Sequence, residues 1–339
     1  MPAPYPTHDR EHAADAMASG DVRPSSADID ARSRRDARMD GAFRLLLQAS
    51  AVLVVVVMLG AALSTLWGGR EVLVKEGWHF FADRTWDPVA DDYGALAPII
   101  GTLTTSLIAL LLAVPTSFGI AMFLTEVAPP WLRTPVATAI DLLASIPSII
   151  YGMWGLFVFV PFMAELEPGL TRTLGRLPFV GVMFQGPPLG LGVLTAGIVL
   201  AVMILPFICA VMRDAFASVP TRLKESAFAL GATRWEVVWH IVLPQTRSAA
   251  VGGVFLGLGR ALGETMAVTF VLGNAFDLST SLLMPGSSIA SAIANEFNEA
   301  PGMHRSALIA LGFVLFVVTF VVLLGARFML RRLAQRQGA

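Results

Sequence analysis

The chain has 339 residues, of which 55% are hydrophobic and only 14% are charged, with a formal net charge of -1 and a mean hydropathy of +0.68. This composition argues against a soluble globular protein and predicts an integral membrane protein. The single cysteine, Cys209, excludes an internal disulfide framework and a cysteine-based metal cluster.

The amino-terminal region, residues 1–40, is rich in Ala, Ser, Asp and Arg and has almost no large apolar side chains. It lacks the apolar segment of a cleavable signal peptide, so we expect a disordered cytoplasmic tail. Residues 41–94 are expected to hold the first transmembrane helix and an outer loop. Aromatic residues in that loop predict anchoring at the membrane interface, with docking of a soluble binding protein as the alternative; they are Trp78, Phe80, Phe81, Trp86 and Tyr93.

Six segments are apolar and long enough for the roughly 20 helical residues that cross a bilayer. Only helices satisfy their own backbone hydrogen bonds over runs of this length in lipid. The predicted fold class is therefore an all-α membrane protein with six transmembrane helices, in which Pro115 and Pro147 should kink the second and third. The spans are predicted near residues 45–66, 97–124, 136–162, 191–211, 249–272 and 307–328.

The distribution of Lys and Arg predicts the orientation of these spans, because positive charge near a span resists translocation. With the amino terminus inside, most of the short basic segments lie on the cytoplasmic side, including residues 213–247 and a carboxyl-terminal tail at 331–339. Both termini and the loop at 213–247 are therefore predicted to be cytoplasmic.

The loop at 213–247 contains a spaced pattern, E-x-A-x3-G-x9-I-x-L-P. Gly231 is placed to end a short helix in the left-handed conformation, and Thr233 with Glu236 has capping-box spacing for a second helix, which Pro244 should close. An ordinary helical connector is the alternative. The residues of the pattern are Glu225, Ala227, Gly231, Ile241, Leu243 and Pro244.

Two opposite charges, Arg260 and Glu264, fall inside the predicted fifth span and should lie on one helical face, one turn apart. A charge near the bilayer centre costs at least about 2.5 to 3.5 kcal/mol, so we expect both to face protein or water and to be paired. The planar guanidinium of Arg260 has N–H donors that match the oxygens of a phosphate. We therefore predict that Arg260 helps to form a transient anion site, and that Glu264 orients Arg260 and partly balances its charge. The alternative is a structural Arg–Glu pair. Asp141 stays an unassigned candidate.

These patterns resemble known transport proteins. The loop pattern is similar to the signature loop of ATP-binding-cassette (ABC) importer permeases, with Ser226 where a second Ala is usual. The sequence GLGRALGETMAV at 257–268 and the second and third spans resemble phosphate-specific permeases of the PstC type. The resemblance covers nearly all of the chain after Gly94. It implies a type I ABC importer permease bundle with its core at 95–330, loop residues that couple to an ATPase, and a substrate pathway that includes Arg260 and Glu264.

The resemblance also implies partners: a homologous second permease of the PstA type, an ABC ATPase dimer and a periplasmic phosphate-binding protein. The substrate would be inorganic phosphate and the location the bacterial inner membrane, with no nucleic acid involved. Only two lysines occur, Lys75 and Lys224, preceded by Val74 and Leu223, so no G-x4-G-K-[ST] phosphate loop exists. We expect no enzymatic activity, cofactor or metal in this chain, and expect ATP and Mg to bind the partner ATPase.

Three alternatives stay open. A permease for another oxyanion, such as phosphonate, sulfate or molybdate, would share the loop pattern. An ion-coupled secondary transporter would use Glu264 as a proton site but leaves the loop spacing unexplained. A membrane scaffold or sensor that does not transport is the third.

Overall fold

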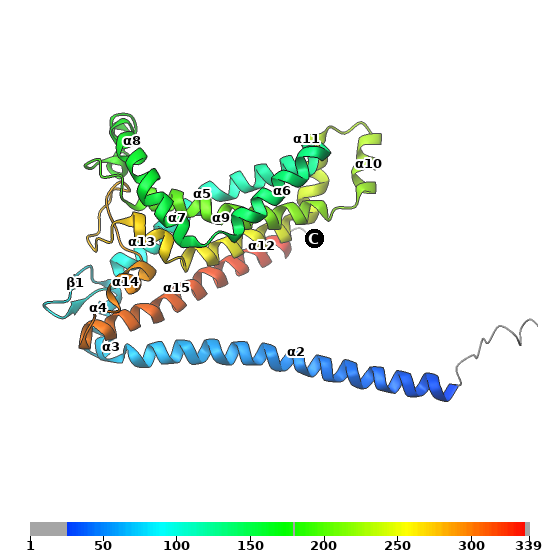
Figure 1. The fold of residues 1–339 in the computed structure, drawn as a ribbon, viewed down its shortest axis with the longest axis horizontal. Helices are drawn as coiled ribbons and strands as arrows, with labels where there is room; N and C mark the ends of the chain where they lie inside the picture. Colours follow the sequence, from blue (N-terminus) through cyan, green and yellow to red (C-terminus); the bar gives the residue numbers. More distant parts are fainter. Residues whose placement is uncertain (1–25, 179, 336–339) are drawn as a thin grey trace, which may run out of the picture. The chain divides into compact units, whose positions relative to one another are not determined.

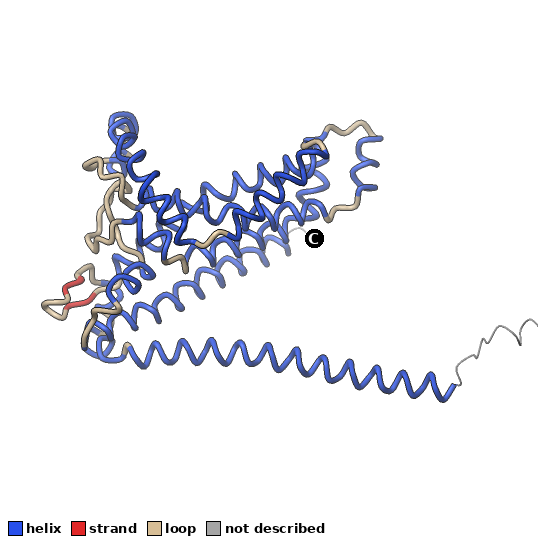
Figure 2. The backbone as a smooth tube through the Cα atoms, viewed as in Figure 1, coloured by secondary structure: helices blue, strands red, loops and turns tan. Residues whose placement is uncertain are grey.

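The computed structural model describes residues 26–178 and 180–335, which are mostly helical (Figures 1 and 2). The chain divides into two compact units, Met1–Ala61 and Ala62–Ala339. The described part of the first unit is a single helix, α2 (Ser26–Gly68), which continues for seven residues into the second unit. Residues Asp40–Gly68 of α2 are long and apolar enough to cross a membrane.

Helices extend into both expected tails. From Ser26 to Asp40 the chain belongs to α2, so this part of the expected disordered tail is helical. These residues include several Ala and Arg, which favour helix, and no Pro or Gly. Residues 1–25 of that tail lie outside the described residues. The last helix runs to Gln335, so 331–335 are helical and 336–339 lie outside the described residues.

The second unit contains one short hairpin and many helices. Its elements up to α9 are α3 (Arg70–Glu76), α4 (His79–Ala82), β1 (Trp86–Asp87), β2 (Asp92–Tyr93), α5 (Leu96–Met122), the π-helical turn η1 (Phe123–Val127), α6 (Pro130–Ser145), α7 (Ser148–Trp154), the π-helical turn η2 (Gly155–Phe159), α8 (Val160–Thr173), the short 3-10 helices η3 (Leu174–Arg176) and η4 (Gly181–Phe184), and α9 (Val193–Ala217). The remainder are α10 (Thr221–Ala229), α11 (Arg234–Val237), the π-helical turn η5 (Val238–Val242), α12 (Leu243–Leu262), α13 (Met266–Leu272), α14 (Ile289–Glu296) and α15 (Gly302–Gln335).

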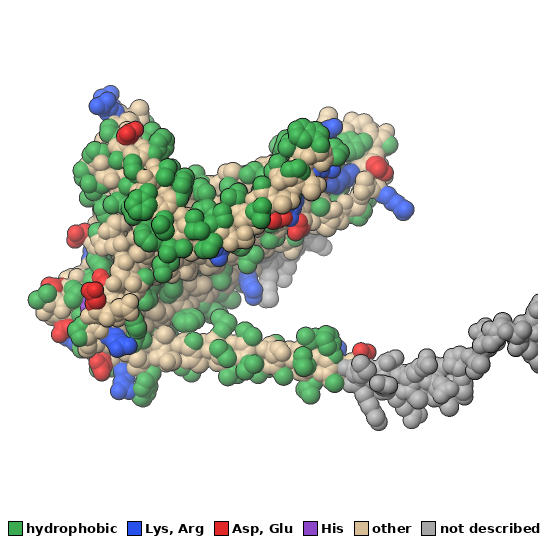
Figure 3. Space-filling model, in the orientation of Figure 1, with side chains coloured by type: hydrophobic (Ala, Val, Ile, Leu, Met, Phe, Trp, Pro, Cys, Tyr) green, Lys and Arg blue, Asp and Glu red, His purple; other side chains and the backbone are tan. Residues whose placement is uncertain are grey.

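Six helical stretches of the described residues are candidates for membrane spans, which confirms the predicted number and order. They are Asp40–Gly68, Leu96–Val127, Ser148–Arg176, Val193–Ala217, Arg234–Leu262 and Gly302–Phe328. The surface agrees with this assignment: on the face shown, uncharged groups cover most of the second unit between its two ends (Figure 3). The boundaries of the third and fifth spans differ from the prediction.

The third span begins at Ser148, because the predicted continuous helix over 136–162 is broken at Ile146–Pro147. Both residues of the break have extended backbone, with ψ of 129° and 138°. The ring of Pro147 disfavours helical backbone at the residue before it, which explains the break. Pro147 therefore precedes α7 and does not kink a span, whereas Pro115 lies inside α5 as predicted. Asp141 lies on α6, outside the span.

The fifth span starts earlier than predicted, at Arg234, and ends at Leu262. Pro244 does not close α11, because the chain passes through η5 directly into α12 with Pro244 in its first turn. A proline clashes with the carbonyl four residues before it in a regular helix, and the wider π-helical turn relieves that clash. The helix is therefore one continuous span from α11 through α12.

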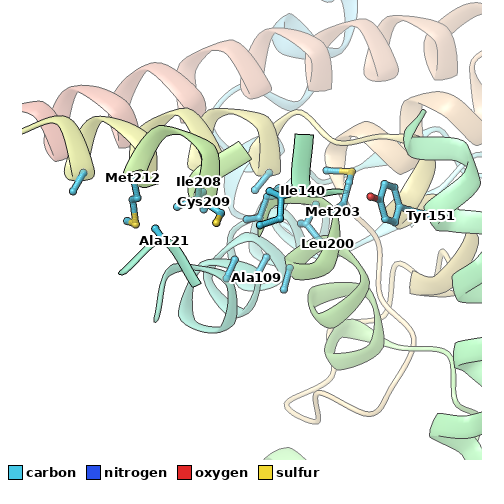
Figure 4. Close-up of a cluster of buried hydrophobic side chains, with 14 of the residues drawn as sticks. Ala109, Ala121, Ile140, Tyr151, Leu200, Met203, Ile208, Cys209 and Met212 are labelled. Carbon is cyan, nitrogen blue, oxygen red and sulfur yellow. The ribbon is translucent and has the colours of Figure 1, made fainter. Parts of the chain in front are cut away.

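Helix α9 lies at the centre of the bundle and packs against α5, α6, α12 and α13. Small residues allow the close approach: a Cβ on Gly197 would lie 2.6 Å from Ile108 of α5, and a Cβ on Gly257 of α12 would lie 2.6 Å from Ile208 of α9. Figure 4 shows the buried side chains of this core, among them Ala109, Ala121, Leu200, Met203, Ile208, Cys209 and Met212. The core holds α5, α9 and α12 together as one frame.

One end of the second unit, called here the hairpin end, consists of α3, α4, the β1–β2 hairpin and α14 (Figure 1). Strands β1 and β2 are antiparallel, with Trp86 opposite Tyr93. The predicted interfacial role is wrong for Phe80 and Tyr93, which are fully buried in a small core of their own. Trp86 stacks on Phe276 with ring centroids 4.9 Å apart, whereas Trp78 is 80% exposed.

A tight turn precedes the hairpin. Asp83 Oδ1 accepts hydrogen bonds from the backbone N–H groups of Arg84 (2.6 Å) and Thr85 (3.2 Å). The bond from Thr85, followed by that from Arg84, holds the pKa of the Asp83 carboxyl below its ordinary value, because both bonds favour the charged form. The turn also requires Gly94, where a Cβ would lie 2.3 Å from the Asp83 carbonyl oxygen.

Candidate functional site

The predicted site in the fifth span lies at a break in the helix. Helix α12 ends at Leu262, Gly263 forms its C-cap, and α13 begins only at Met266. Helix α13 packs against α7, which itself follows the break at Ile146–Pro147. A Cβ on Gly152 of α7 would lie 2.9 Å from the carbonyl oxygen of Met266, so the two short helices are in close backbone contact.

Glu264 lies within this break and is 8% exposed. Its Oε1 accepts a hydrogen bond from the backbone N–H of Ala267 at 3.2 Å. The carboxylate thereby satisfies one of the free N–H groups of the first turn of α13 and lies at the favourable end of that helix for a negative charge. Glu264 thus positions α13 in the structure.

Arg260 lies in the last turn of α12, where the carbonyl end of the helix favours a positive charge. Its guanidinium carbon lies 4.4 Å from the ring centroid of Phe207 on α9, which is a cation–π contact. Its Nε is buried and has no hydrogen-bond partner among the described residues. None of the ion pairs between described residues involves Arg260, so its charge is available to a further group.

The predicted ion pair between Arg260 and Glu264 is therefore wrong, because the two side chains do not pair. The four-residue spacing places two side chains on one face only if the helix is continuous, and this helix ends between them. In the part of the chain that the structure describes, no ion pair joins the two side chains. Of the glycines near them, Gly253 and Gly257 closely approach α9, whereas Gly259 has nothing within 4 Å of an added Cβ.

The loop pattern lies at the opposite end of the second unit from the hairpin, called here the α10 end (Figure 1). Gly231 has φ of +88° and nothing within 4 Å of an added Cβ, so backbone conformation alone calls for glycine there, as predicted. The predicted capping box is also present: Glu236 N donates to Thr233 Oγ1 at 3.3 Å, and Thr233 N donates to Glu236 Oε2 at 2.7 Å.

The residues of the loop pattern divide into inward and outward groups. Ala227 and Ile241 are half-buried and pack against the core around α9. Leu243 is also half-buried, whereas Glu225, Gly231 and Pro244 are exposed. Large apolar side chains nearby are exposed on the polar helix α10, on the turn that follows it and at the start of the fifth span, and a cluster of this kind is typical of a binding surface. This apolar surface consists of Leu223, Phe228, Leu230, Trp235 and Trp239.

Two ion pairs join helices at the α10 end of the second unit. Lys224 Nζ of α10 lies 2.5 Å from Glu126 Oε1 of η1. Arg213 of α9 lies 3.2 Å from Asp141 of α6, so the previously unassigned Asp141 takes part in a surface ion pair. Among the described residues there is no group of three or more His, Cys, Asp or Glu that could hold a metal ion.

The family model for the binding-protein-dependent transport system inner membrane component matches residues 116–335. Phosphate transport system permease protein PstC of Xylella fastidiosa (strain 9a5c) is 62% identical over 308 residues, which cover 91% of this chain and 95% of that protein. The chain belongs to the PstC family of transport permeases. This permease is also 55% identical over 297 residues to PstC of Pasteurella multocida (strain Pm70), covering 87% of this chain and 93% of that one.

A solved structure of a bacterial alginate ABC transporter, in complex with an alginate pentasaccharide-bound periplasmic protein, has the same fold as this permease. The TM-score is 0.57 at 21% identity, and the match covers 88% of this chain and 97% of that chain. The prediction of a type I ABC importer permease bundle is confirmed, and the protein is a multi-pass membrane protein.

Two contacts were not predicted from the sequence: Phe207 with Arg260, and Glu126 with Lys224. Each pair joins residues far apart in the chain, and an aromatic residue in an apolar span has no feature that distinguishes it from a core residue. Lys224 did offer a signal, because it is one of only two lysines and follows directly on Leu223 of the apolar surface.

Proposed function

We propose that this chain is the transmembrane permease subunit of an ATP-driven importer of inorganic phosphate and forms half of the translocation path. The observation that carries the proposal is the free charge of Arg260 within a membrane-spanning helix, without a carboxylate partner among the described residues. The names of the PstC relatives support phosphate as the substrate.

Arg260 is the group that would meet the anion. An unpaired charge within a bilayer is costly, so it is retained where it binds a counter-ion or lines a water-filled path. Phe207 covers one face of the guanidinium and leaves the N–H groups at its edge for the oxygens of a tetrahedral anion. Glu264 accepts a hydrogen bond from the first turn of α13 and does not form an ion pair with Arg260, so its role is to fix the start of α13 beside the path.

We assign the partner proteins to the two ends of the second unit. We place both termini and the α10 end in the cytoplasm of a bacterium, with an ABC ATPase dimer bound to the apolar surface and to the exposed residues of the loop pattern. ATP and Mg bind that ATPase, and this chain needs no cofactor or metal. A second permease of the PstA type completes the path in the inner membrane. A periplasmic phosphate-binding protein docks at the hairpin end, where Trp78 is exposed.

Transport would then follow from the movement of α10. A driving force shifts an equilibrium between inward-facing and outward-facing states only if it acts differently on the two. Closure of the ATPase dimer on ATP binding acts differently on the two states, because it draws together the loop at 213–247 of this chain and the corresponding loop of the second permease. Phosphate released from the binding protein passes Arg260 on its way through the membrane.

The experiment is uptake of labelled phosphate into proteoliposomes that contain this chain with its partner proteins, with and without ATP. We expect ATP-dependent uptake that resists excess sulfate or phosphonate. Arg260→Gln should lower uptake by about tenfold or more, as expected for the loss of hydrogen bonds to a charged group. Arg247→Gln is the matched control, because it removes an arginine from the first half of the same helix.

Each alternative has its own outcome. Uptake that needs only an ion gradient would refute the ABC mechanism in favour of a secondary transporter. ATP-dependent uptake that sulfate, molybdate or phosphonate abolishes would keep the mechanism and change the substrate. Equal loss of uptake in Arg260→Gln and Arg247→Gln would remove Arg260 from the path.

A further inference from the structure

Helix α10 has little contact with the rest of the permease. None of its residues is buried, and only Lys224 and Ala227 are half-buried. These two residues are three apart and therefore lie on the same face of the helix. Ala227 contributes one methyl group to the core around α9. Lys224 is therefore the only charged residue on the inward face of α10.

The partner of Lys224 belongs to the end of the second span. Glu126 lies on η1, the π-helical turn that follows α5, and its Oε1 lies 2.5 Å from Lys224 Nζ. The two side chains are 14% and 10% exposed, much less than those of the other lysine pair, Lys75 with Glu76, at 44% and 18%. Ion pairs that are withdrawn from water are less screened by salt and more costly to break than surface pairs.

Glu126 is itself held rigidly. Leu124 and Ala128, on either side of it, are 3% and 1% exposed and belong to the core around α9. Helix α5, which leads into this turn, packs closely along α9, with Gly197 of α9 against Ile108 of α5. A displacement of Glu126 therefore cannot be absorbed locally and must move the end of α5 against its neighbours.

We propose that the Lys224–Glu126 ion pair is the positioning contact that transmits movement of α10 to α5, and that it sets how many phosphate ions are moved per ATP hydrolysed. The inference rests on the proposed function. The methyl group of Ala227 can resist compression of α10 onto the bundle but offers little resistance to its withdrawal, whereas a charge-assisted hydrogen bond resists separation. The pair thus couples the helix in both directions of its movement.

The test uses the complete complex in proteoliposomes, with phosphate uptake and ATP hydrolysis measured in the same sample. Lys224→Met and Glu126→Gln should each lower the ratio of phosphate moved to ATP hydrolysed by about fivefold or more, while ATP hydrolysis stays within about twofold. Lys224→Arg, and the exchange of charges in the double variant Lys224→Glu with Glu126→Lys, should restore the ratio. Lys75→Met is the matched control, because it removes the only other lysine and its ion pair at the hairpin end, and should leave the ratio unchanged.

The outcomes separate this inference from the proposed function. If the wild-type complex takes up no phosphate with ATP, the proposed function fails. If the wild type transports and the single variants keep its ratio, the inference alone is overturned. Variants that lose uptake and hydrolysis in equal proportion, or that fail to assemble by size-exclusion chromatography even as Glu126→Gln, would assign the pair to assembly and also overturn it.

Discussion

Gly101 allows a close approach of α5 to the segment before α14, and its replacement by alanine should destabilise the protein. A Cβ at this position would lie 1.9 Å from the Ser287 carbonyl oxygen, whereas real contacts of a Cβ are essentially never shorter than 3.0 Å. The two segments must therefore separate by about 1.1 Å, the difference between these distances. That separation strains the neighbouring hydrogen bond, in which Ile289 N donates to Thr102 Oγ1 at 2.9 Å.

The loss of folding free energy expected for Gly101→Ala has two parts. Overpacking of this kind costs about 1 to 3 kcal/mol, and a buried N–H left without an acceptor costs about 1 to 3 kcal/mol more. The gain in helix propensity from Gly to Ala offsets about 1 kcal/mol. We therefore expect Gly101→Ala to lower the midpoint of thermal unfolding in detergent by roughly 5 °C or more.

The matched control is Gly119→Ala, in the same helix. An added Cβ at Gly119 has nothing within 4 Å, so this variant should be as stable as the wild type or slightly more stable. If Gly101→Ala and Gly119→Ala unfold at the same temperature, the close approach of α5 to Ser287 does not exist in the folded protein.

Two further predictions concern a charge and an aromatic ring. Asp83→Asn removes a carboxylate whose pKa is held below the ordinary 3.8 by the two backbone N–H groups that follow it. A carboxyl group whose pKa is lowered by folding stabilises the folded protein at a pH above its ordinary pKa, and this stabilisation is lost as the pH falls through the folded-state pKa. Asp83→Asn should therefore unfold at a lower temperature than the wild type at pH 7, and the difference in unfolding temperature should shrink below pH 3.8. A difference in unfolding temperature that does not change with pH would contradict this. Phe207→Leu removes the cation–π cover of the guanidinium and should lower phosphate uptake by about threefold to tenfold, whereas Phe162→Leu, at an exposed ring of α8, should not; equal effects would refute a specific contact.

The sequence alone determined the features that depend on local composition. Six apolar runs identified the membrane spans, because a bilayer selects for length and hydropathy regardless of packing. The capping box at Thr233 and the left-handed turn at Gly231 were also predictable, since their partners lie within a few residues. The family resemblance rested on the loop pattern and the GRALGETMAV segment, and the comparisons confirm it.

Only the tertiary structure decided where helices break and which charges meet. The fifth span ends at Leu262 and α13 starts at Met266, so Arg260 and Glu264 separate although their spacing suggested a pair. Arg260 instead contacts Phe207 of α9. Lys224 meets Glu126 across 98 residues of sequence. Such contacts arise from how α5, α9 and α12 pack, and packing depends on the shapes of surfaces that come together only in the folded bundle.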